Sequence, residues 1–285
     1  MRKRLWILPL LCLAIPAFAQ WRTDSVADGL ILRSFDGNEC TTGRPQSIRV
    51  LDLDTSVPGG DIQLQYDANE RHCSDAVVQA GGIAGINAGF EPEALEIGSN
   101  GETSRSVKIR PNDRRWFMHQ GRLAWNCPSD FSIARRDSST ANNLLTSGPL
   151  LIVDHNCSIA KGYVAPSLTD DELRKLHHHD LNNFAWLHHP RTIVAVTDSG
   201  HVLFITIDGR FNQATGMSLA EAADFLAHNF NVRDAINMDG GGSTTMVVKG
   251  YGDSETSVVN HPCDDGQFTH NNQRNLTSFL VLVKK

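Results

Sequence analysis

A carboxylate followed by three glycines and three hydroxyl residues is the stretch of this sequence best suited to chemistry. Asp239 ends an apolar run, Gly240 to Gly242 follow it, and Ser243 to Thr245 lead into a β-branched segment. The pattern favours a strand, a polar glycine turn and a second strand. Consecutive glycines let the backbone approach a ligand closely or take conformations closed to residues with a Cβ. A tight hairpin turn would explain the glycines, but it needs neither the carboxylate nor the hydroxyl cluster, so we interpret the stretch as a site.

Other polar residues fall at or beside the ends of further predicted strands. Strand ends are where proteins built on sheets usually assemble their sites. A carboxylate there could stabilise a cationic centre, and arginine side chains together with glycine-turn amides could hold a phosphate. These additional candidates are Asn87, Arg191, Asp208, Arg210 and Arg274.

Two familiar motifs are missing from the sequence. The segment from Gly241 to Thr245 lacks the closing glycine of the G-x-S-x-G nucleophile elbow, and the residues after Ser243 are strand-like rather than helical. No G-x-x-x-x-G-K-[ST] segment occurs. The sequence therefore argues against an α/β-hydrolase elbow and against a nucleotide-binding P-loop.

The order of the candidate segments resembles the phosphodiester glycosidase family. Its most specific part is Asn237-Met-Asp-Gly-Gly-Gly-Ser-Thr-Thr245 with a preceding Asp208-Gly-Arg210, and the likeness runs from about Gly82 to the C-terminus. Asn87-Ala-Gly-Phe90 stands where the family more usually has Asn-Gly-Gly-Phe. Residues 20–80 have no counterpart in this pattern. The remaining segments that carry the resemblance are Ser147–Leu150, His189–Thr192, Gly216–Leu219 and Asn260–Pro262.

The resemblance implies an enzyme that hydrolyses a sugar-1-phosphodiester at its glycosidic bond and releases free sugar and a phosphomonoester. Such cleavage passes through an oxocarbenium-like state that a carboxylate can stabilise or trap. A phosphate is already an acidic leaving group, so donors that bind its charge can largely replace a general acid. On this hypothesis the catalytic residues are Asp239 or Asp208 beside the anomeric carbon, with Asn87 and Thr244 orienting hydroxyl groups. The predicted substrate- and phosphate-binding residues are Arg191, Arg210, Gly240, Gly241, Gly242, Ser243, Thr244 and Arg274.

Two other functions remain open from the sequence. A non-catalytic envelope or exopolysaccharide-binding protein could keep the glycine turn as a carbohydrate contact. A metal-dependent phosphodiesterase could use Asp208 and Asp239 with a histidine of the run His177 to His179. Consecutive histidines point in different directions, however, and such a run is more typical of an exposed polar loop than of a metal site. We predict no required cofactor, and a divalent metal has no support beyond this run.

The N-terminus predicts export. Residues 2–4 are basic, residues 5–15 are apolar, and residues 17–19 form a small-x-small cleavage site, so residues 1–19 are expected to be a signal peptide. The apolar run is too short for a membrane span, and no other long apolar run follows. We expect a soluble periplasmic or secreted protein.

The net charge limits the classes of binding partner, and the cysteine content bears on disulfide bonds and metal sites. The formal net charge is −6, which argues against binding nucleic acid by counterion release. We therefore expect a phosphorylated carbohydrate or an envelope glycan as partner. Export favours disulfides, but an odd number of cysteines after signal removal leaves at least one thiol free or paired between chains. None forms a CxxC pair, so a structural zinc site is not expected. The mature cysteines are Cys40, Cys73, Cys127, Cys157 and Cys263.

The elements that must position the candidate residues are mostly strands. Alternating or β-branched apolar segments predict strands at 29–33, 47–54, 62–66, 83–90, 193–197, 202–207 and 276–283. The strongest helix signal is a capping box formed by Ser218 and Glu221, with apolar residues on one face as far as Phe230. A second, shorter helix is predicted over residues 74–80.

No internal repeat or low-complexity linker divides the mature sequence. We therefore predict an α+β protein with a single domain, built on a mixed, mostly antiparallel sheet with few helices. Residues 20–80 form a β-rich N-terminal part of unassigned role, and residues 81–285 form the catalytic domain. The charged, glycine-broken stretch 91–115 is predicted to be a surface excursion or a lid.

Overall fold

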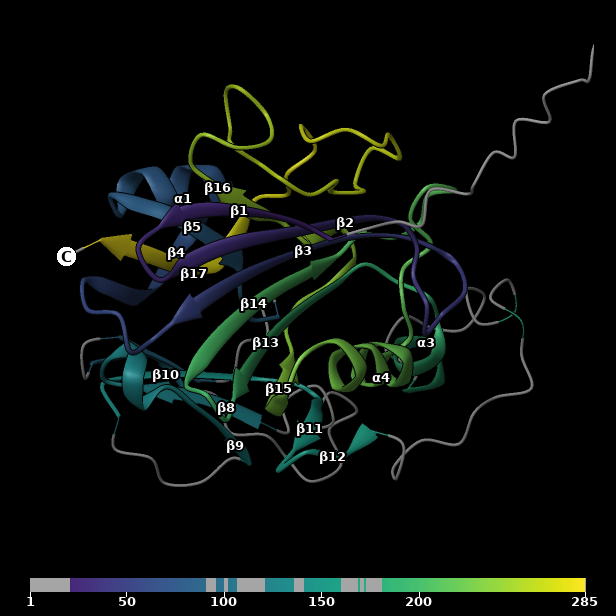
Figure 1. Cartoon of the computed structure of the whole chain (residues 1–285). Helices are drawn as coiled ribbons and strands as arrows, with labels where there is room; N and C mark the ends of the chain where they lie inside the picture. Colours follow the sequence, from purple (N-terminus) through teal and green to yellow (C-terminus); the bar gives the residue numbers. More distant parts are fainter. Residues whose placement is uncertain are drawn as a thin grey trace, which may run out of the picture.

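In the part of the chain that the structure describes, three β-sheets and a few helices make up the fold (Figure 1). The computed structural model describes residues 21–90, 96–99, 102–106, 121–135, 141–159, 169, 172 and 181–284. Every paired strand runs antiparallel to its neighbours, as in the central pairs of β14 with β3 and β13. The α+β architecture with mostly antiparallel sheets and few helices is confirmed.

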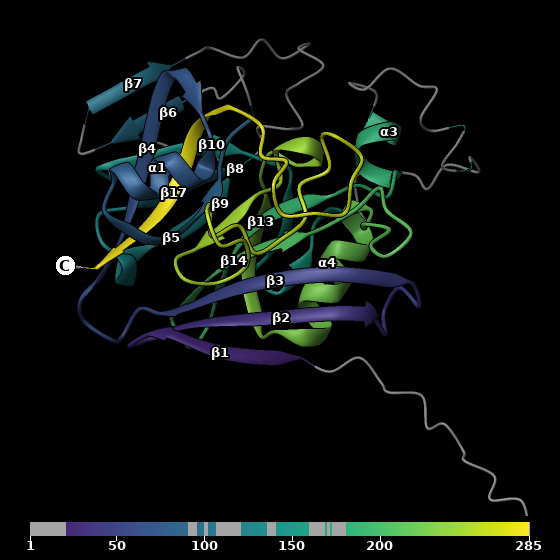
Figure 2. The ribbon, with the colours of Figure 1, turned by 90° about the horizontal axis from the view of Figure 1, so that it is seen from above.

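The largest sheet has eight strands in the order β1-β2-β3-β14-β13-β15-β11-β12. Its strands come from distant parts of the sequence, and their bounds are β1 (Arg22–Ala27), β2 (Leu30–Asn38), β3 (Pro45–Asp54), β11 (Leu150–Val153), β12 (Asn156–Cys157), β13 (Arg191–Thr197), β14 (His201–Ile207) and β15 (Val232–Asn237). Figure 2 shows β1, β2 and β3 running side by side along one margin of the molecule.

The two smaller sheets pack against the rest of the molecule. One has the order β16-β5-β17-β4, with β4 (Gly60–Arg71), β5 (Gly82–Asn87), β16 (Met246–Val248) and β17 (Leu276–Lys284). The other has the order β7-β6-β10-β8-β9, with β6 (Glu96–Ser99), β7 (Glu102–Ser106), β8 (Gly121–Trp125), β9 (Ser132–Arg135) and β10 (Asn143–Ser147). The helices are α1 (Cys73–Gln79), α3 (Leu181–Trp186) and α4 (Leu219–Asn229), with short 3₁₀ turns η2 (Pro128–Asp130) and η4 (Gly241–Ser243).

The central strands are buried on both faces. On β14, Leu203 and Ile205 belong to the apolar cluster that includes α4, whereas Val202 and Phe204 belong to the cluster shared with the smaller sheets. Successive side chains of a strand point to opposite faces, so this strand must be apolar throughout. That requirement explains the continuous hydrophobic run of β14.

The predicted capping box forms at the start of α4. The Ser218 hydroxyl accepts from the Glu221 amide at 3.2 Å, and the Glu221 carboxylate accepts from the Ser218 amide at 2.9 Å. The buried face of the helix includes Leu219, Phe225 and Leu226. This face packs over β11 and β15, so α4 fixes the strand that leads to Asp239.

The N-terminal segment is part of the main sheet. β3 pairs with β14 along seven residues, from His201 opposite Asp54 to Ile207 opposite Ile48. The same segment supplies β4, which pairs with the C-terminal strand β17. The β-rich part that had no role assigned from the sequence therefore adjoins β14, which leads to Asp208.

Several sequence-based expectations fall outside the described residues. They include the run His177 to His179, residues 107–115 of the predicted lid and the predicted signal peptide. None of the described helices has the length and apolar character needed to cross a membrane.

The structure corrects the expectation of disulfides. All five cysteines that follow the predicted signal peptide carry free thiols. Cys73 and Cys263 are buried and Cys40 is exposed, and burial raises the pKa of the Cys73 thiol. Secretion favours disulfides only where two cysteines come within bonding geometry, and this fold brings no such pair together among them.

Candidate active site

The sheet topology brings the two candidate aspartates to the same edge. β14 and β15 both pair antiparallel with β13, so they run parallel to each other and end together. Ile207 lies opposite Arg191, and Asn237 lies opposite Ile193. With one strand between them, the two strand ends are about 10 Å apart. The chain continues from these ends into Asp208 and Asp239.

Asp208 is buried and surrounded by hydrogen-bond donors. Its carboxylate accepts from Ser47 Oγ at 2.8 Å, from Asn260 Nδ2 at 2.9 Å and from the His261 amide at 3.0 Å, and His261 Nδ1 lies 2.9 Å away. Burial alone would raise the pKa of this carboxyl, but the hydrogen bonds and charge of its partners, first of all His261, hold the pKa below its ordinary value. Asp208 is thus an ionised carboxylate whose oxygens are hydrogen-bonded by other residues of the protein.

Asp239 is half-buried and faces an arginine. Its amide donates to the Ala88 carbonyl at 3.0 Å, and its carbonyl accepts from Asn87 Nδ2 at 2.7 Å. The hydrogen-bonded carboxylate of Asp264 raises the pKa of Arg274, and the charge of Asp239 adds to that rise. Hydrogen bonds to Ala88 and Asn87 therefore fix the backbone of Asp239, and its carboxylate interacts electrostatically with Arg274.

Asn87 holds three chain segments together. It ends β5 as the sequence predicts, and it is completely buried. Its Oδ1 accepts from Thr192 Oγ1 at 2.8 Å and from the Thr245 amide at 3.1 Å, while its Nδ2 bonds the carbonyl of Asp239. The structure thus places Asn87 beneath the glycine bend, where it positions Asp239.

The glycine bend, residues 240–243, is a tight turn with little spare room. The Gly241 amide donates to the Pro190 carbonyl at 2.9 Å, and the Ser243 amide donates to the Gly240 carbonyl at 3.2 Å. In the described part of the chain, the Gly242 amide has no hydrogen-bond partner. A Cβ on Gly240 would lie 2.7 Å from the Pro190 carbonyl oxygen. Close packing therefore requires glycine here, and the amide of the buried Gly242 is a donor without a partner among the described residues.

Two guanidinium groups reach this bend from different segments. Arg210 lies within 3.4 Å of His189 Nδ1 through Nε and within 3.5 Å of Cys263 Sγ through Nη1. A Cβ on Gly241 would sit 2.9 Å from Arg210 Nη2, so the guanidinium lies directly on the bend. Arg210 is exposed and has a positive φ of 69°, a conformation that is uncommon outside glycine.

Arg274 approaches the same bend in a bidentate ion pair. Its Nε and Nη2 bond the Asp264 carboxylate at 2.8 and 2.6 Å, and its Nη1 lies 3.4 Å from Ser243 Oγ. A Cβ on Gly242 would collide with both members of this pair. Arg274 and Asp264 therefore cover the bend, and the pair stays accessible because the Arg274 side chain is 46% exposed.

Arg191 does not reach the surface of the bend. Its Nε donates to the Met217 carbonyl at 2.9 Å, and its Nη2 donates to the carbonyls of Phe184 and Leu187 at 2.9 and 3.0 Å. Burial, with a smaller contribution from the charge of Arg210, lowers the pKa of Arg191 to about 9. The guanidinium lies in the protein interior, where it ties α3 to the segment that precedes α4.

Four residues at the site received no role from the sequence-based hypothesis. His189 contacts Arg210, Asp264 pairs with Arg274, and Asn260 and His261 hold Asp208. His189, Asn260 and His261 lie in segments that carry the family resemblance, which was the available signal. Asp264 had none, because only the folded loop brings its carboxylate to Arg274.

The described residues contain no group of three or more His, Cys, Asp or Glu side chains arranged to hold a metal ion. The histidine run 177–179, which was the sequence-based metal candidate, lies outside them. Of the two aspartates in that metal hypothesis, Asp208 has its carboxylate bonded to protein donors.

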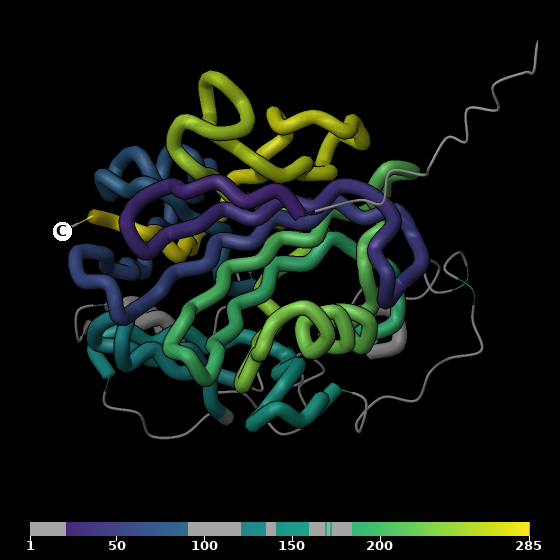
Figure 3. The backbone as a smooth tube through the Cα atoms, viewed as in Figure 1, coloured from purple at the N-terminus to yellow at the C-terminus, as the bar shows by residue number. Residues whose placement is uncertain are grey.

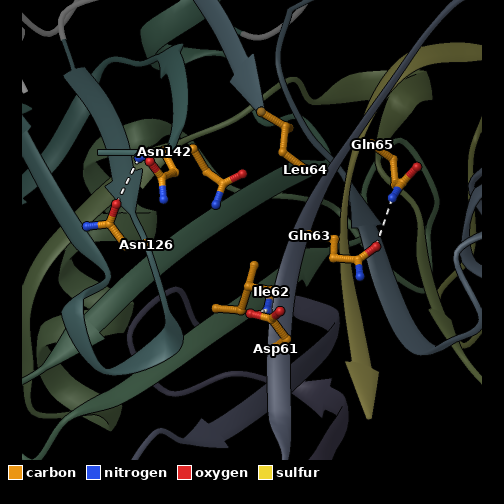
Figure 4. A pocket seen from close by; sticks show the side chains of 8 residues that line it. Asp61, Ile62, Gln63, Leu64, Gln65, Asn126 and Asn142 are labelled. Carbon is orange, nitrogen blue, oxygen red and sulfur yellow. Dashed lines mark hydrogen bonds between the residues drawn. The ribbon is translucent and has the colours of Figure 1, made fainter. Parts of the chain in front are cut away.

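Among the cavities of the described residues, two that lie apart from the bend have polar linings. One of about 190 Å³ is bordered by β4 and by the segments that flank η2 and β10 (Figure 4). Its polar groups bond one another, as Gln65 Nε2 does with Gln63 Oε1 at 3.0 Å and the Asn142 amide with Asn126 Oδ1 at 2.9 Å. The other, of about 540 Å³, lies beside β2 and β3 and includes His261 among its lining residues.

A sequence model of the phosphodiester glycosidase family matches residues 72–283. The chain belongs to the phosphodiester glycosidase family. Members of this family are hydrolases, and the match includes β14 and β15, which lead to Asp208 and Asp239, together with the glycine bend. β1 to β3 precede the matched range and nevertheless complete the main sheet.

Comparison with individual proteins agrees with this family. Bovine N-acetylglucosamine-1-phosphodiester α-N-acetylglucosaminidase is 35% identical over 86 residues, which are 30% of this chain and only 15% of that relative. The zebrafish enzyme of the same name, solved as a catalytic domain auto-inhibited by its pro-peptide, superposes with a TM-score of 0.65 at 17% identity and covers 94% of this chain and 88% of its own. A Synechocystis protein gives a TM-score of 0.61 at 12% identity over 93% of this chain and 64% of its own. The structural likenesses show a shared fold.

Proposed function

We propose that this protein is an exported phosphodiester glycosidase that cleaves the glycosidic bond of a sugar-1-phosphodiester. One observation carries the proposal: Arg210 and Arg274 meet at a glycine bend directly after the carboxylate residue Asp239. Family membership supports the reaction class, the name of the bovine relative supports a sugar phosphodiester as substrate, and the N-terminal pattern supports export.

The phosphate half of the substrate fits the arginine side of the bend. Guanidinium groups bind phosphate oxygens through paired, charged hydrogen bonds. Arg210 and Arg274 with the Gly242 amide would hold the phosphate, and they would bind it more strongly as it takes up the charge of the leaving group. Arg274 must exchange its bonds to Asp264 for bonds to the phosphate, since its Nε and Nη2 are engaged in that pair.

The sugar half then places its anomeric carbon near Asp239. As the bond from the anomeric carbon to the bridging oxygen breaks, its electron pair leaves with the phosphate, and positive charge develops on the sugar ring. The Asp239 carboxylate stabilises or traps that charge. Water supplies a hydroxyl group to the anomeric carbon, and its proton goes to the phosphomonoester or to solvent, so that free sugar and a phosphomonoester result.

Asp208 takes a positioning role in this proposal. Its carboxylate is buried and bonded to Ser47, Asn260 and His261, so it has little capacity to contact a sugar. By holding Asn260, whose Oδ1 also accepts from the Met246 amide at 2.7 Å, it fixes the chain that follows the bend. Arg191 positions the His189–Pro190 segment in a similar way, from beneath.

Hydrolysis in oxygen-18 water tests the proposal. With N-acetylglucosamine-1-phospho-methyl ester as the first substrate, we expect the label in the released sugar, because water attacks the anomeric carbon. Mass spectrometry of both products reads the outcome. Label in the phosphate would overturn the proposal in favour of a phosphodiesterase. Saturable binding of a panel of sugar-1-phosphodiesters without turnover of any of them would overturn it in favour of a glycan-binding protein.

A further inference from the structure

The larger cavity, which we call the β2–β3 pocket, lies beside the proposed active site and shares His261 with it. It has a volume of about 540 Å³, and its lining includes Ser34 and Arg49 from the sheet and Tyr251, His261, Phe268 and His270 from the C-terminal loops. Figure 3 shows these loops, in yellow-green and yellow, above the purple strands β1 and β2 in this view. The Tyr251 hydroxyl donates to the Ser25 carbonyl at 3.0 Å, which joins loop and sheet.

Two neighbouring polar side chains form the floor of this pocket. Ser34 on β2 lies directly opposite Arg49 on β3. Side chains that face each other in this way stand about 5 Å apart at Cβ and share one face of the sheet. Ser34 is only 3% exposed and Arg49 only 6%, so both are placed by the fold rather than by solvent.

Both side chains have donors that the protein leaves unused. The Ser34 hydroxyl is buried and has no hydrogen-bond partner among the described residues. Arg49 donates through Nε to the Val259 carbonyl at 3.0 Å and through Nη1 to Asp36 Oδ1 at 3.0 Å. Its Nη2 has no partner in the described part of the chain. A buried donor without a partner is costly to the fold, so a ligand that accepts from the Ser34 hydroxyl would satisfy an existing deficit, and Arg49 Nη2 offers a second donor beside it.

The side walls of the pocket are aromatic and favour the binding of a ring-shaped ligand. Phe268 stacks on His261 with ring centroids 3.7 Å apart, and His270 stacks on His261 at 4.4 Å. The half-buried Tyr251 adds a further aromatic ring. Aromatic rings offer flat apolar surface with polar groups at their margins, which suits a sugar ring whose hydroxyl groups point sideways.

We propose that the β2–β3 pocket binds a sugar that carries an oxyanion. The anion, a carboxylate or a phosphate, accepts from Arg49 Nη2 and Ser34 Oγ, and the sugar ring lies among Tyr251 and Phe268. Guanidinium groups bind both kinds of oxyanion, so the two share one chemistry. This binding does not depend on hydrolysis at the glycine bend.

Calorimetric titration of the mature chain with three probes tests the proposal. D-glucuronate supplies the carboxylate, glucose 6-phosphate supplies the phosphate, and glucose is neutral. We expect at least one charged sugar to bind at least about tenfold more tightly than glucose, because one charged pair is worth about that factor. The tighter of the two charged probes identifies the oxyanion. Equal affinities for all three probes would overturn the proposal.

Matched variants locate the binding. Ser34→Val removes the hydroxyl from the floor of the pocket and introduces a side chain that is favourable in strands. We therefore expect it to weaken the binding of the charged probe about fivefold or more. Ser25→Val makes the same change at an exposed position of β1 and should leave the affinity unchanged. Phe268→Leu removes an aromatic wall of the pocket but no hydrogen-bond donor, so it should weaken the binding of all three sugars. It replaces Ser34→Val as the test variant if a thermal melt shows that Ser34→Val is unstable.

A last variant separates this pocket from the proposed active site. Arg274→Gln removes a guanidinium at the glycine bend and none from the β2–β3 pocket. Unchanged affinity for the charged probe in Arg274→Gln, with weaker binding in Ser34→Val or Phe268→Leu, supports the proposal. Lost affinity in Arg274→Gln, with unchanged binding in Ser34→Val and Phe268→Leu, would place the anion at the bend and overturn it.

Discussion

Asp208 and Asp239 occupy comparable places in the fold and have opposite surroundings. Each follows a strand that pairs with β13, and both strands end at the same edge. Asp208 is fully buried and bonded to Ser47, Asn260 and His261, whereas Asp239 is half-buried beside Arg274. The same residue type thus serves as an internal anchor in one place and as a candidate reactive group in the other.

The difference arises from what lies outside each strand. β3 flanks β14 and brings Ser47 to Asp208, and the segment at Asn260 closes over the carboxylate from above. After β15 the chain passes through Asp239 into the glycine bend, and guanidinium groups from two other segments approach that bend. A strand-end aspartate is therefore reactive or structural according to its neighbours.

The largest expected effect comes from Asp239→Asn. The substitution removes the charge beside the anomeric carbon and changes the shape of the side chain very little. We expect kcat/KM for a sugar-1-phosphodiester to fall by about 10³-fold, as for the loss of one preorganised electrostatic contact in other enzymes, with a small change in the free energy of unfolding. Steady-state kinetics and urea denaturation measure the two quantities.

Asp224→Asn is the matched control for that variant, because Asp224 is exposed on α4. It should keep wild-type activity. Near-full activity in Asp239→Asn would break the comparison, since Asp239 could then not be the carboxylate that the reaction uses.

Asp208→Asn should affect stability before activity. An amide in place of this carboxylate would present a donor to His261, whose amide and Nδ1 both lie within 3.0 Å of the same carboxylate oxygen. Breaking a buried charged network of this kind costs about 3 kcal/mol of the free energy of unfolding. Urea denaturation at neutral pH measures the loss, and an unchanged midpoint would contradict the anchoring role.

Acid titration provides a second measurement on Asp208→Asn. The pKa of Asp208 is lower in the folded protein than its ordinary value of 3.8, so its ionisation stabilises the fold above that pH. This contribution is lost as the pH falls from about 3.8 through the folded-state pKa. The variant lacks it, and its free energy of unfolding should therefore decline less steeply over this range than that of the wild type.

The smallest effect is expected from Gly242→Ala, which tests whether the arginine beside Asp239 must be held in place. A Cβ at this position would collide with the Asp264–Arg274 pair and push the guanidinium away from the bend. We expect kcat/KM to fall by about tenfold to a hundredfold, because small displacements of a positioning group have effects of this size.

Gly60→Ala is the control for that variant, since a Cβ there meets only Leu53 at an ordinary distance of 3.7 Å. It should change neither activity nor stability by a measurable amount. Wild-type kinetics in Gly242→Ala would show that the Asp264–Arg274 pair can shift without consequence, and Arg274 would then lose its place in the phosphate site.

The sequence by itself determined the local structure and the family. Runs of apolar and β-branched residues located strands such as β13 and β14, and the Ser218–Glu221 capping box located α4, because these signals act between neighbours in the chain. The glycine run after Asp239 pointed to a site because glycine in that number requires close backbone packing, which the bend displays.

Only the tertiary structure decided what each polar residue contacts. Ser47 lies 161 positions before Asp208, and Asn260 lies 52 positions after it, so no local pattern could predict that this carboxylate is buried and bonded. The same holds for Arg191, which turned inward to three carbonyls, and for the Ser34–Arg49 floor, which exists only through the register of β2 with β3. The hydrogen bonds and the burial of a side chain depend on segments that are distant in the sequence and pack together in the fold. A single sequence does not show directly which segments pack together.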